Sequence, residues 1–153
     1  MNKHIRLLML PLLMMSLFSL TSCSEEASEY VGEWVCTTSY EKTVQIYWGN
    51  EKVTDSQDVP GIDWTAVLVV KSDRSVQYVH KNGETTNGRI SVMSGKASFS
   101  GLNFSSSYKF KLKKDDFGHK KLEYSWSEDK HCLDCSEKRR HIVFEEKRES
   151  TSY

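Results

Sequence analysis

The fold is decided by residues 64–78, which read WTAVLVVKSDRSVQY. Residues 64–70 are the most continuously apolar run after the N-terminal segment, and this pattern predicts the most buried β-strand of the protein. Asp73, Arg74 and Ser75 then supply a polar turn, and Val76 and Tyr78 follow it at a spacing of two residues. Two strands joined by so short a connection must run antiparallel.

The same period of two extends from this unit toward both ends of the chain. Clusters of Gly, Asn, Asp and Ser separate the runs, which are rich in β-branched and aromatic residues, and we find no convincing helix after residue 22. The alternating sets are Trp34, Cys36 and Thr38; Val44, Ile46 and Trp48; Ile90 and Val92; Phe99; Tyr108, Phe110 and Leu112; Leu122, Tyr124 and Trp126; Ile142 and Phe144.

These runs predict an all-β protein, an antiparallel up-and-down meander of about eight strands. An open meander of that length would expose two unpaired edges, and closing the sheet on itself removes them. We therefore expect a small barrel, with a two-sheet β-sandwich as the alternative.

The N-terminal 23 residues have the order of a bacterial lipoprotein signal. Lys3 and Arg6 precede an apolar run of 14 residues, 7–20, and the sequence Leu-Thr-Ser-Cys closes the segment at Cys23. A membrane-spanning helix needs about 20 apolar residues, so this run is too short to be one. The segment resembles a lipobox, which implies that residues 1–22 are removed and that Cys23 carries lipid, including acyl chains such as palmitate.

The segment after the cysteine predicts a short tether and a location. Residues 23–29 comprise Cys23 and a polar, acidic stretch that also resembles the export signal of surface lipoproteins in the Bacteroidetes lineage, although an ordinary disordered tether has the same composition. We expect a lipid anchor in the outer membrane, on its periplasmic or its cell-surface face. Residues 30–148 would form one domain, and residues 149–153 a disordered tail.

Charge and motifs exclude several classes of function. Removal of residues 1–22 takes two of the 21 basic residues and none of the 21 acidic ones, which leaves a formal charge of −2. The two signs are interspersed, so we predict no nucleic-acid partner. The chain carries none of the common hydrolase, zinc-protease or phosphate-loop motifs, and its histidines share no evident partner. We predict that it is not an enzyme and has no cofactor.

Residues 30–34, Tyr-Val-Gly-Glu-Trp, begin the first predicted strand with a Gly-x-Trp motif. In this respect the domain resembles the lipocalin-like and fatty-acid-binding-like barrels. The resemblance implies structural roles for Gly32 and Trp34, and an arginine from the last strand packed across the ring of Trp34. Arg140 and Arg148 both share a strand face with Ile142 and Phe144; of the two, Arg140 is our candidate.

Three cysteines remain once Cys23 carries lipid. Cys132 and Cys135 lie in one polar turn, where we predict a disulfide between them, and Cys36 would then be a small buried residue. Pairing of Cys36 with either of the other two is the alternative. A zinc site built from His131, the two turn cysteines, and His119 or His141 has weaker support, because one Cys-x-x-Cys pair without a second is a common pattern. We predict no metal site.

Two functions follow from a barrel of this size, which either is filled by side chains or holds one small ligand. The first is binding of a small apolar or amphipathic molecule by Trp48, Tyr78, Tyr108, Tyr124 and Trp126, with the polar loop 49–63 as a lid. The second is a filled barrel that acts as an envelope interaction protein, such as an inhibitor, immunity or assembly lipoprotein. A large dry cavity would favour the first, and a filled interior with an exposed aromatic patch the second.

Overall fold

The computed structural model describes residues 27–128 and 133–148. It contains nine antiparallel strands, preceded by a single helical turn at residues 27–30. The strands are β1 (Gly32–Tyr47), β2 (Asn50–Gln57), β3 (Val67–Val70), β4 (Ser75–Val79), β5 (Thr85–Met93), β6 (Lys96–Ser100), β7 (Phe110–Lys114), β8 (Lys120–Ser127) and β9 (Asp134–Glu146).

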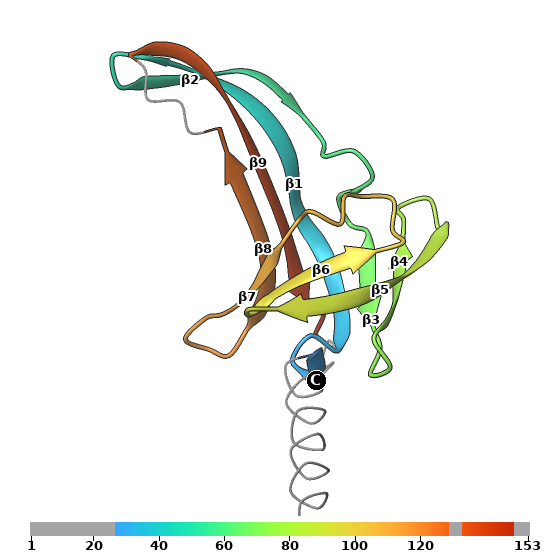
Figure 1. Cartoon of the computed structure of the whole chain (residues 1–153). Coiled ribbons are helices and arrows are strands. Elements are labelled where there is room, and N and C mark those ends of the chain that lie inside the picture. The colour runs from blue at the N-terminus through green and yellow to red at the C-terminus, as the bar shows by residue number, and fades with distance from the viewer. Residues whose placement is uncertain (1–26, 129–132, 149–153) are drawn as a thin grey trace, which may run out of the picture.

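Eight of these strands form a closed ring of hydrogen-bonded pairs. The order runs β1-β3-β4-β5-β6-β7-β8-β9, and β9 pairs back onto β1 (Figure 1). The all-β antiparallel meander is therefore confirmed, and the ring closes as a barrel-like sheet. The joint between β6 and β7 is the shortest, with two residue pairs, whereas β1 and β9 pair over almost their whole length.

Strand β1 is the long element around which the molecule is organised. Where the alternation predicted two strands, one strand of 16 residues runs from Gly32 to Tyr47, with a register shift between Cys36 and Thr38. Its first residues pair with β3, and residues 41–47 pair with β2 instead.

The second half of β1 belongs to a four-stranded extension of the barrel, which we call the arm. It consists of residues 41–47 of β1, all of β2, residues 125–127 of β8 and residues 134–141 of β9. The arm projects well beyond β3–β7 (Figure 1). The predicted lid at residues 49–63 is wrong, because residues 50–57 form strand β2, whose backbone groups pair with β1. Every residue of β2 is exposed.

Aromatic and aliphatic side chains fill the interior of the ring. Phe110, at the centre, has its ring centroid 5.6 Å from that of Phe99 and 5.8 Å from that of Phe144. Edge-to-face contacts of this kind add to the free energy gained by burial. The largest fully buried side chains are those of Trp34, Tyr78, Phe99, Phe110, Phe144, Ile62, Leu68, Leu122, Ile142, Val44, Val59 and Val76.

The apolar run 64–70 is only partly the strand that its composition predicts. Val67–Val70 form β3, with Leu68 fully buried, but Trp64 is 58% exposed. The chain turns before the strand begins, since Ala66 donates its backbone N–H to the carbonyl of Asp63, and Thr65 has a φ of 74°.

One end of the barrel is covered by the residues that lead into β1. Tyr30 is buried and its hydroxyl donates to the carbonyl of Gly95, while the indole Nε1 of Trp34 donates to the carbonyl of Tyr30 at 2.9 Å. Gly32 lies between them with a φ of +146°, a conformation that L side chains rarely adopt. The Gly-x-Trp motif thus has a structural reason: the glycine turns the chain into β1, and the tryptophan fills the end of the core.

The predicted pairing of Arg140 with Trp34 is wrong. Arg140 lies opposite Glu41 in the β1–β9 ladder, whereas Trp34 lies opposite Glu146 at the other end of it. At about 3.3 Å per residue, roughly 20 Å of strand separates Trp34 from Glu41. The other candidate, Arg148, is exposed.

The ladder also decides which cysteines can meet. Cys36 lies opposite Phe144 and Cys135 opposite Ile46, so about 30 Å of β1 separates the two, far beyond the distance of about 7 Å that a disulfide spans between Cα atoms. Pairing of Cys36 with Cys135 is therefore wrong, and Cys36 is a free, buried thiol. Cys23 and Cys132 lie outside the described residues, so the lipidation and the Cys132–Cys135 disulfide stay predictions.

We expect Cys36 to resist alkylation in the folded protein. Burial raises its pKa to about 12, so almost no reactive thiolate exists at pH 8. Iodoacetamide should label it more than about a hundredfold faster in strong denaturant than in buffer, as followed by mass spectrometry without reductant. Cys36→Ser should abolish this increment of mass. Equal rates in buffer and denaturant would show that the thiol is accessible in solution.

Candidate functional site

Five residues lie close together where the arm joins the barrel, and we call this group the mouth: Glu41, Tyr108, Tyr124, Trp126 and Arg140. The guanidinium of Arg140 donates to Oε2 of Glu41 through both Nε and a terminal nitrogen. It also lies over the rings of Tyr108 and Trp126, at 5.2 and 5.7 Å from their centroids. The guanidinium is thus engaged by a carboxylate and by two aromatic rings of the protein itself.

The ion pair affects the pKa of the Glu41 carboxyl group. Hydrogen bonding from Arg140 holds the pKa of Glu41 below its usual range, against an opposing effect of burial. Both side chains are largely shielded, at 24% exposure for Arg140 and 17% for Glu41. Since charge-assisted hydrogen bonds are stronger than neutral ones, the pair reinforces the β1–β9 ladder, in which the two residues are directly opposed.

Three of the five residues predicted to line a ligand site come together here. Tyr108 and Tyr124 have ring centroids 4.8 Å apart, and Trp126 is on the same face of the sheet, opposite Arg140. Beneath them, the ring of Phe104 stacks parallel to that of Tyr108. Aromatic rings therefore continue from the mouth into the core.

The other two predicted residues lie elsewhere. Tyr78 is fully buried against Phe104 and Phe144, and its hydroxyl accepts a hydrogen bond from the backbone N–H of Asp63, while burial raises its pKa. Trp48 is 66% exposed at the β1–β2 turn, the far end of the arm. The prediction that it shares a site with the four other residues is wrong, because β1 continues into the arm where a lid was expected.

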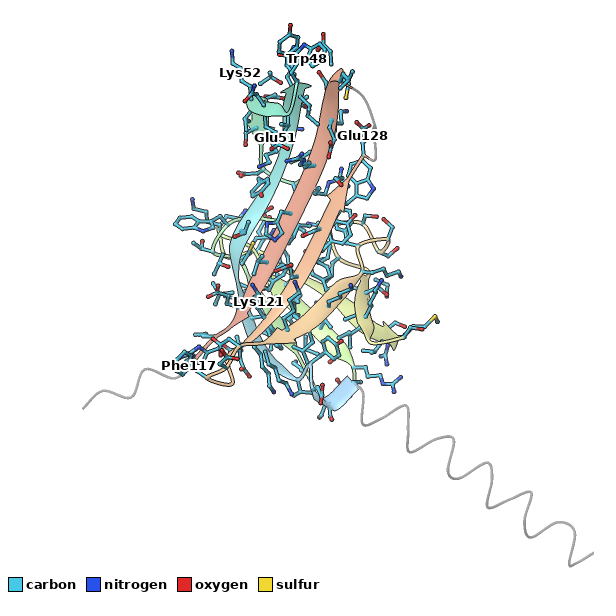
Figure 2. All side chains as sticks on the ribbon, turned by 90° about the vertical axis from the view of Figure 1, so that its left-hand side faces the viewer. Trp48, Glu51, Lys52, Phe117, Lys121 and Glu128 are labelled. Carbon is cyan, nitrogen blue, oxygen red and sulfur yellow. The ribbon has the colours of Figure 1, made fainter. Side chains whose placement is uncertain are left out.

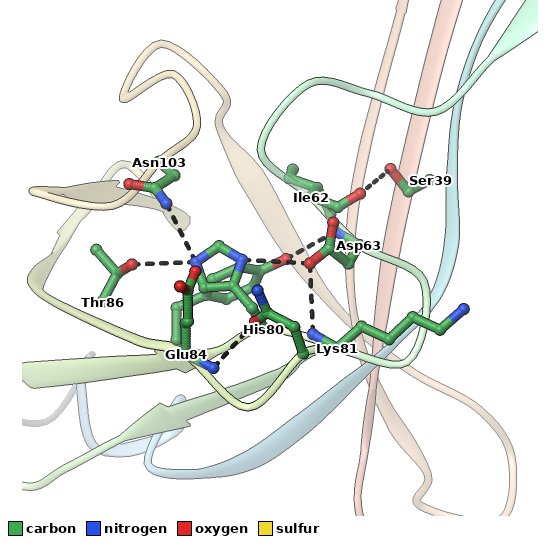
Figure 3. Close-up of polar contacts among 10 residues, drawn as sticks. Ser39, Ile62, Asp63, His80, Lys81, Glu84, Thr86 and Asn103 are labelled. Atoms are coloured by element: carbon green, nitrogen blue, oxygen red, sulfur yellow. Dashed lines mark hydrogen bonds and ion pairs between the residues drawn. The ribbon is translucent and has the colours of Figure 1, made fainter.

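A polar cluster around His80 closes the side of the barrel (Figure 3). The imidazole Nδ1 lies 3.2 Å from Oδ2 of Asp63, and Nε2 lies 3.0 Å from Oγ1 of Thr86 and 3.2 Å from Nδ2 of Asn103. Three separate segments thus meet on one histidine side chain, which is 10% exposed. The sequence offered no signal for this cluster, since its members are far apart in the chain.

The order hydroxyl–imidazole–carboxylate in this cluster is the order of a hydrolase triad. However, the hydroxyl of Thr86 and the amide of Asn103 compete for Nε2, which has a single lone pair. The backbone nearby is also tightly packed, because a Cβ on Gly61 would lie 2.1 Å from the carbonyl oxygen of Asn103. We interpret the cluster as a clamp that holds loop 58–66 and loop 101–109 to β4 and β5.

The far end of the arm carries an apolar patch, which we call the tip: Tyr47, Trp48 and Leu133. Their exposures are 55%, 66% and 67%, and the N–H of Trp48 donates to the carbonyl of Leu133 at 3.1 Å. The rings of Tyr47 and Trp48 meet edge to face at 6.3 Å. Figure 2 shows Trp48 at one extreme of the molecule.

The turn that presents Trp48 is strained. Trp48 and Gly49 both have positive φ, 47° and 81°, as a two-residue type I′ turn requires. Asn, Asp or Gly ordinarily occupies the first of these positions, and a bulky residue there costs about 1–2 kcal/mol. Because Trp-Gly is not among the dipeptides that signal a two-residue hairpin, the sequence carries no signal for this turn, and its pattern predicts a loop at residues 49–63.

No family model, curated protein or solved structure matches this chain. Within residues 27–128 and 133–148, no group of three or more His, Cys, Asp or Glu side chains is placed to hold a metal ion. Nor does this part of the chain contain a helix long and apolar enough to cross a membrane.

Proposed function

We propose that this protein is a membrane-tethered interaction module that binds a partner protein through the tip of its arm. The observation that carries the proposal is the exposed tip formed by Tyr47, Trp48 and Leu133. Aromatic side chains are enriched in the central, energetically dominant positions of protein interfaces, and they are unfavourable in water.

Backbone strain supports the same proposal. A tryptophan in the left-handed region stabilises neither the turn nor the core, so its presence at position 48 is unfavourable for folding alone. Strained residues of this kind are concentrated at functional positions, where a specific side chain is needed.

The small-ligand alternative has less support. The centre of the barrel is occupied by Phe99, Phe110 and Phe144, and the mouth by the Arg140–Glu41 pair. An apolar ligand entering there would have to displace Arg140 from two aromatic rings and from a carboxylate. The displaced guanidinium would lose its carboxylate partner and lie against an apolar ligand, and an unpaired charge in apolar surroundings is energetically costly.

Replacing Trp48 with asparagine should separate binding from folding. Because asparagine tolerates the left-handed conformation, we expect Trp48→Asn to raise the free energy of unfolding by about 1 kcal/mol and to abolish partner binding. Urea unfolding measures the first effect. For the second, a photo-crosslinking amino acid is placed at position 47 in the full-length, membrane-anchored protein, in cells that express the chain with or without the Trp48→Asn substitution.

The matched control places the same crosslinker at Ser72, in the turn at the opposite end of the barrel. The proposal predicts one protein adduct of discrete mass from position 47, its loss in the Trp48→Asn variant, and none of it from position 72. Absence of any protein adduct, together with a stoichiometric small molecule in the native mass spectrum of the purified chain, would instead favour the carrier function.

A further inference from the structure

The described chain begins at the end of the barrel opposite the tip, and several turns are gathered there. Val70, opposite Gly32 in the β1–β3 ladder, leads into the β3–β4 turn, and the hydroxyl of Tyr30 reaches Gly95 in the β5–β6 turn. Lys114, at the end of β7, lies 3.9 Å from Glu29. We call this region the base.

The base is the part of the domain nearest to the predicted lipid. Cys23 precedes Ala27, the first described residue, by four positions, so a fully extended chain places it within about 14 Å of the base. If Cys23 carries lipid, a tether this short holds the base close to the membrane surface. Figure 2 shows Phe117 at this end of the molecule and Trp48 at the other.

The β7–β8 hairpin at the base carries a cluster of lysines. Lys113 lies directly opposite Lys121, and Lys114 directly opposite Lys120. Like charges in directly opposed positions of an antiparallel pair are destabilising. Glu123 offsets part of the repulsion, through contacts of 2.6 Å to Lys113 and 3.3 Å to Lys121. On the other side of β8, Glu145 lies opposite Lys121, and residues 111–121 themselves hold five lysines against two aspartates.

The turn of this hairpin holds an aromatic ring out in solvent. Oδ1 of Asp115 accepts hydrogen bonds from the backbone N–H groups of Phe117 and His119, at 2.9 and 2.8 Å, and the N–H of Gly118 donates to the Asp115 carbonyl. These bonds fix the turn. Desolvation acts to raise the pKa of Asp115, but the hydrogen bonds to Oδ1 hold that pKa below its usual range. Phe117 is nevertheless 85% exposed, the highest value among the large apolar side chains described.

We propose that the β7–β8 hairpin is a membrane-contact element that docks the base on an anionic lipid surface. Phe117 enters the interfacial layer, and Lys113, Lys114, Lys120 and Lys121 bind lipid phosphates. Binding at a lipid interface requires an apolar group that enters the headgroup layer and basic groups that attract anionic lipids. Phe117 in the turn and the lysines on the adjoining strands supply the two. The proposal rests on the predicted lipid anchor at Cys23, and it orients the arm so that its tip points away from the membrane.

The test uses the full chain, lipidated in a Gram-negative host, with its acyl groups verified by mass spectrometry. It is reconstituted in vesicles of phosphatidylethanolamine and phosphatidylglycerol. A photo-crosslinking amino acid replaces Phe117 in one variant and Trp48, an exposed aromatic residue of the opposite end, in the other. We expect lipid adducts at position 117 to exceed those at position 48 by about tenfold. Equal yields, or an excess at position 48, would overturn the proposal.

A charge variant tests the role of the lysines. Lys113→Gln, Lys114→Gln, Lys120→Gln and Lys121→Gln are combined, and circular dichroism checks that the fold is retained. Lipid adducts at position 117 should fall about threefold or more, while Lys52→Gln with Lys138→Gln on the arm should leave them unchanged. An unchanged yield in the base variant would contradict binding of lipid phosphates. Because position 117 reports on lipid and position 47 on a protein partner, failure of this proposal is distinguishable from failure of the proposed function.

Discussion

Phe110→Ala is expected to lower the free energy of unfolding by about 3–5 kcal/mol, since truncating a fully buried phenylalanine loses both its transfer free energy and the contacts around the cavity that is left. Phe110 is completely shielded from solvent and contacts the rings of Phe99, Phe104, Tyr124 and Phe144. Domains of this kind have a total stability of about 5–15 kcal/mol, so the variant should be marginal at 37 °C. Urea unfolding followed by circular dichroism measures the effect.

The chain offers a matched control for this experiment in Phe117, which undergoes the same chemical change but is 85% exposed. Phe117→Ala should change the free energy of unfolding by less than about 0.5 kcal/mol. If both substitutions cost less than about 1 kcal/mol, the interior of the barrel is not the packed core described above.

The second large effect concerns the mouth and depends on pH. Arg140→Ala is expected to lower the free energy of unfolding by about 2–3 kcal/mol at pH 7, because it leaves the shielded carboxylate of Glu41 without its partner and removes the cation from two aromatic rings. Unfolding by urea at pH 7, 4 and 3 measures this difference.

The direction of the pH effect follows from Glu41. Its pKa is lowered in the folded state, so its contribution to stability is fully present above the ordinary glutamate value of about 4.3 and is lost as the pH falls through the folded-state pKa. The gap between wild type and Arg140→Ala should therefore narrow between pH 7 and pH 3. Glu41→Gln should show the same narrowing, and a gap that is constant with pH would contradict the assigned role of the pair.

Local patterns predicted most of the fold. The alternation around Leu68, Val76, Tyr78, Phe110, Leu122 and Phe144 placed these residues in the core, because a residue's face in a strand depends only on its parity. Short turns between the strands excluded a parallel sheet. The Gly-x-Trp motif also identified two residues with structural roles, although the arginine that the lipocalin resemblance implied lies elsewhere.

Predictions about the site failed where they depended on whether segments distant in the chain lie close together in the fold. Trp48 has the same parity as Ile46, and only the pairing of residues 41–47 with β2 shows that this part of β1 lies outside the closed ring. Nothing in the sequence prevents Cys36 from pairing with Cys135, but the register of β1 and β9 places the two residues far apart. His80, Asp63, Thr86 and Asn103 meet only because two loops fold over β4 and β5.

The sequence by itself determined the all-β class, the antiparallel connections, most of the core and the prediction of a lipid anchor, since each of these follows from composition, local periodicity or a contiguous segment. Only the tertiary structure decided that aromatic side chains occupy the centre of the barrel, that Arg140 pairs with Glu41, and that Trp48 and Phe117 are exposed at opposite ends. These features depend on strand register and on which strand continues past the closed ring, and both are set by pairing between residues as much as about 110 positions apart.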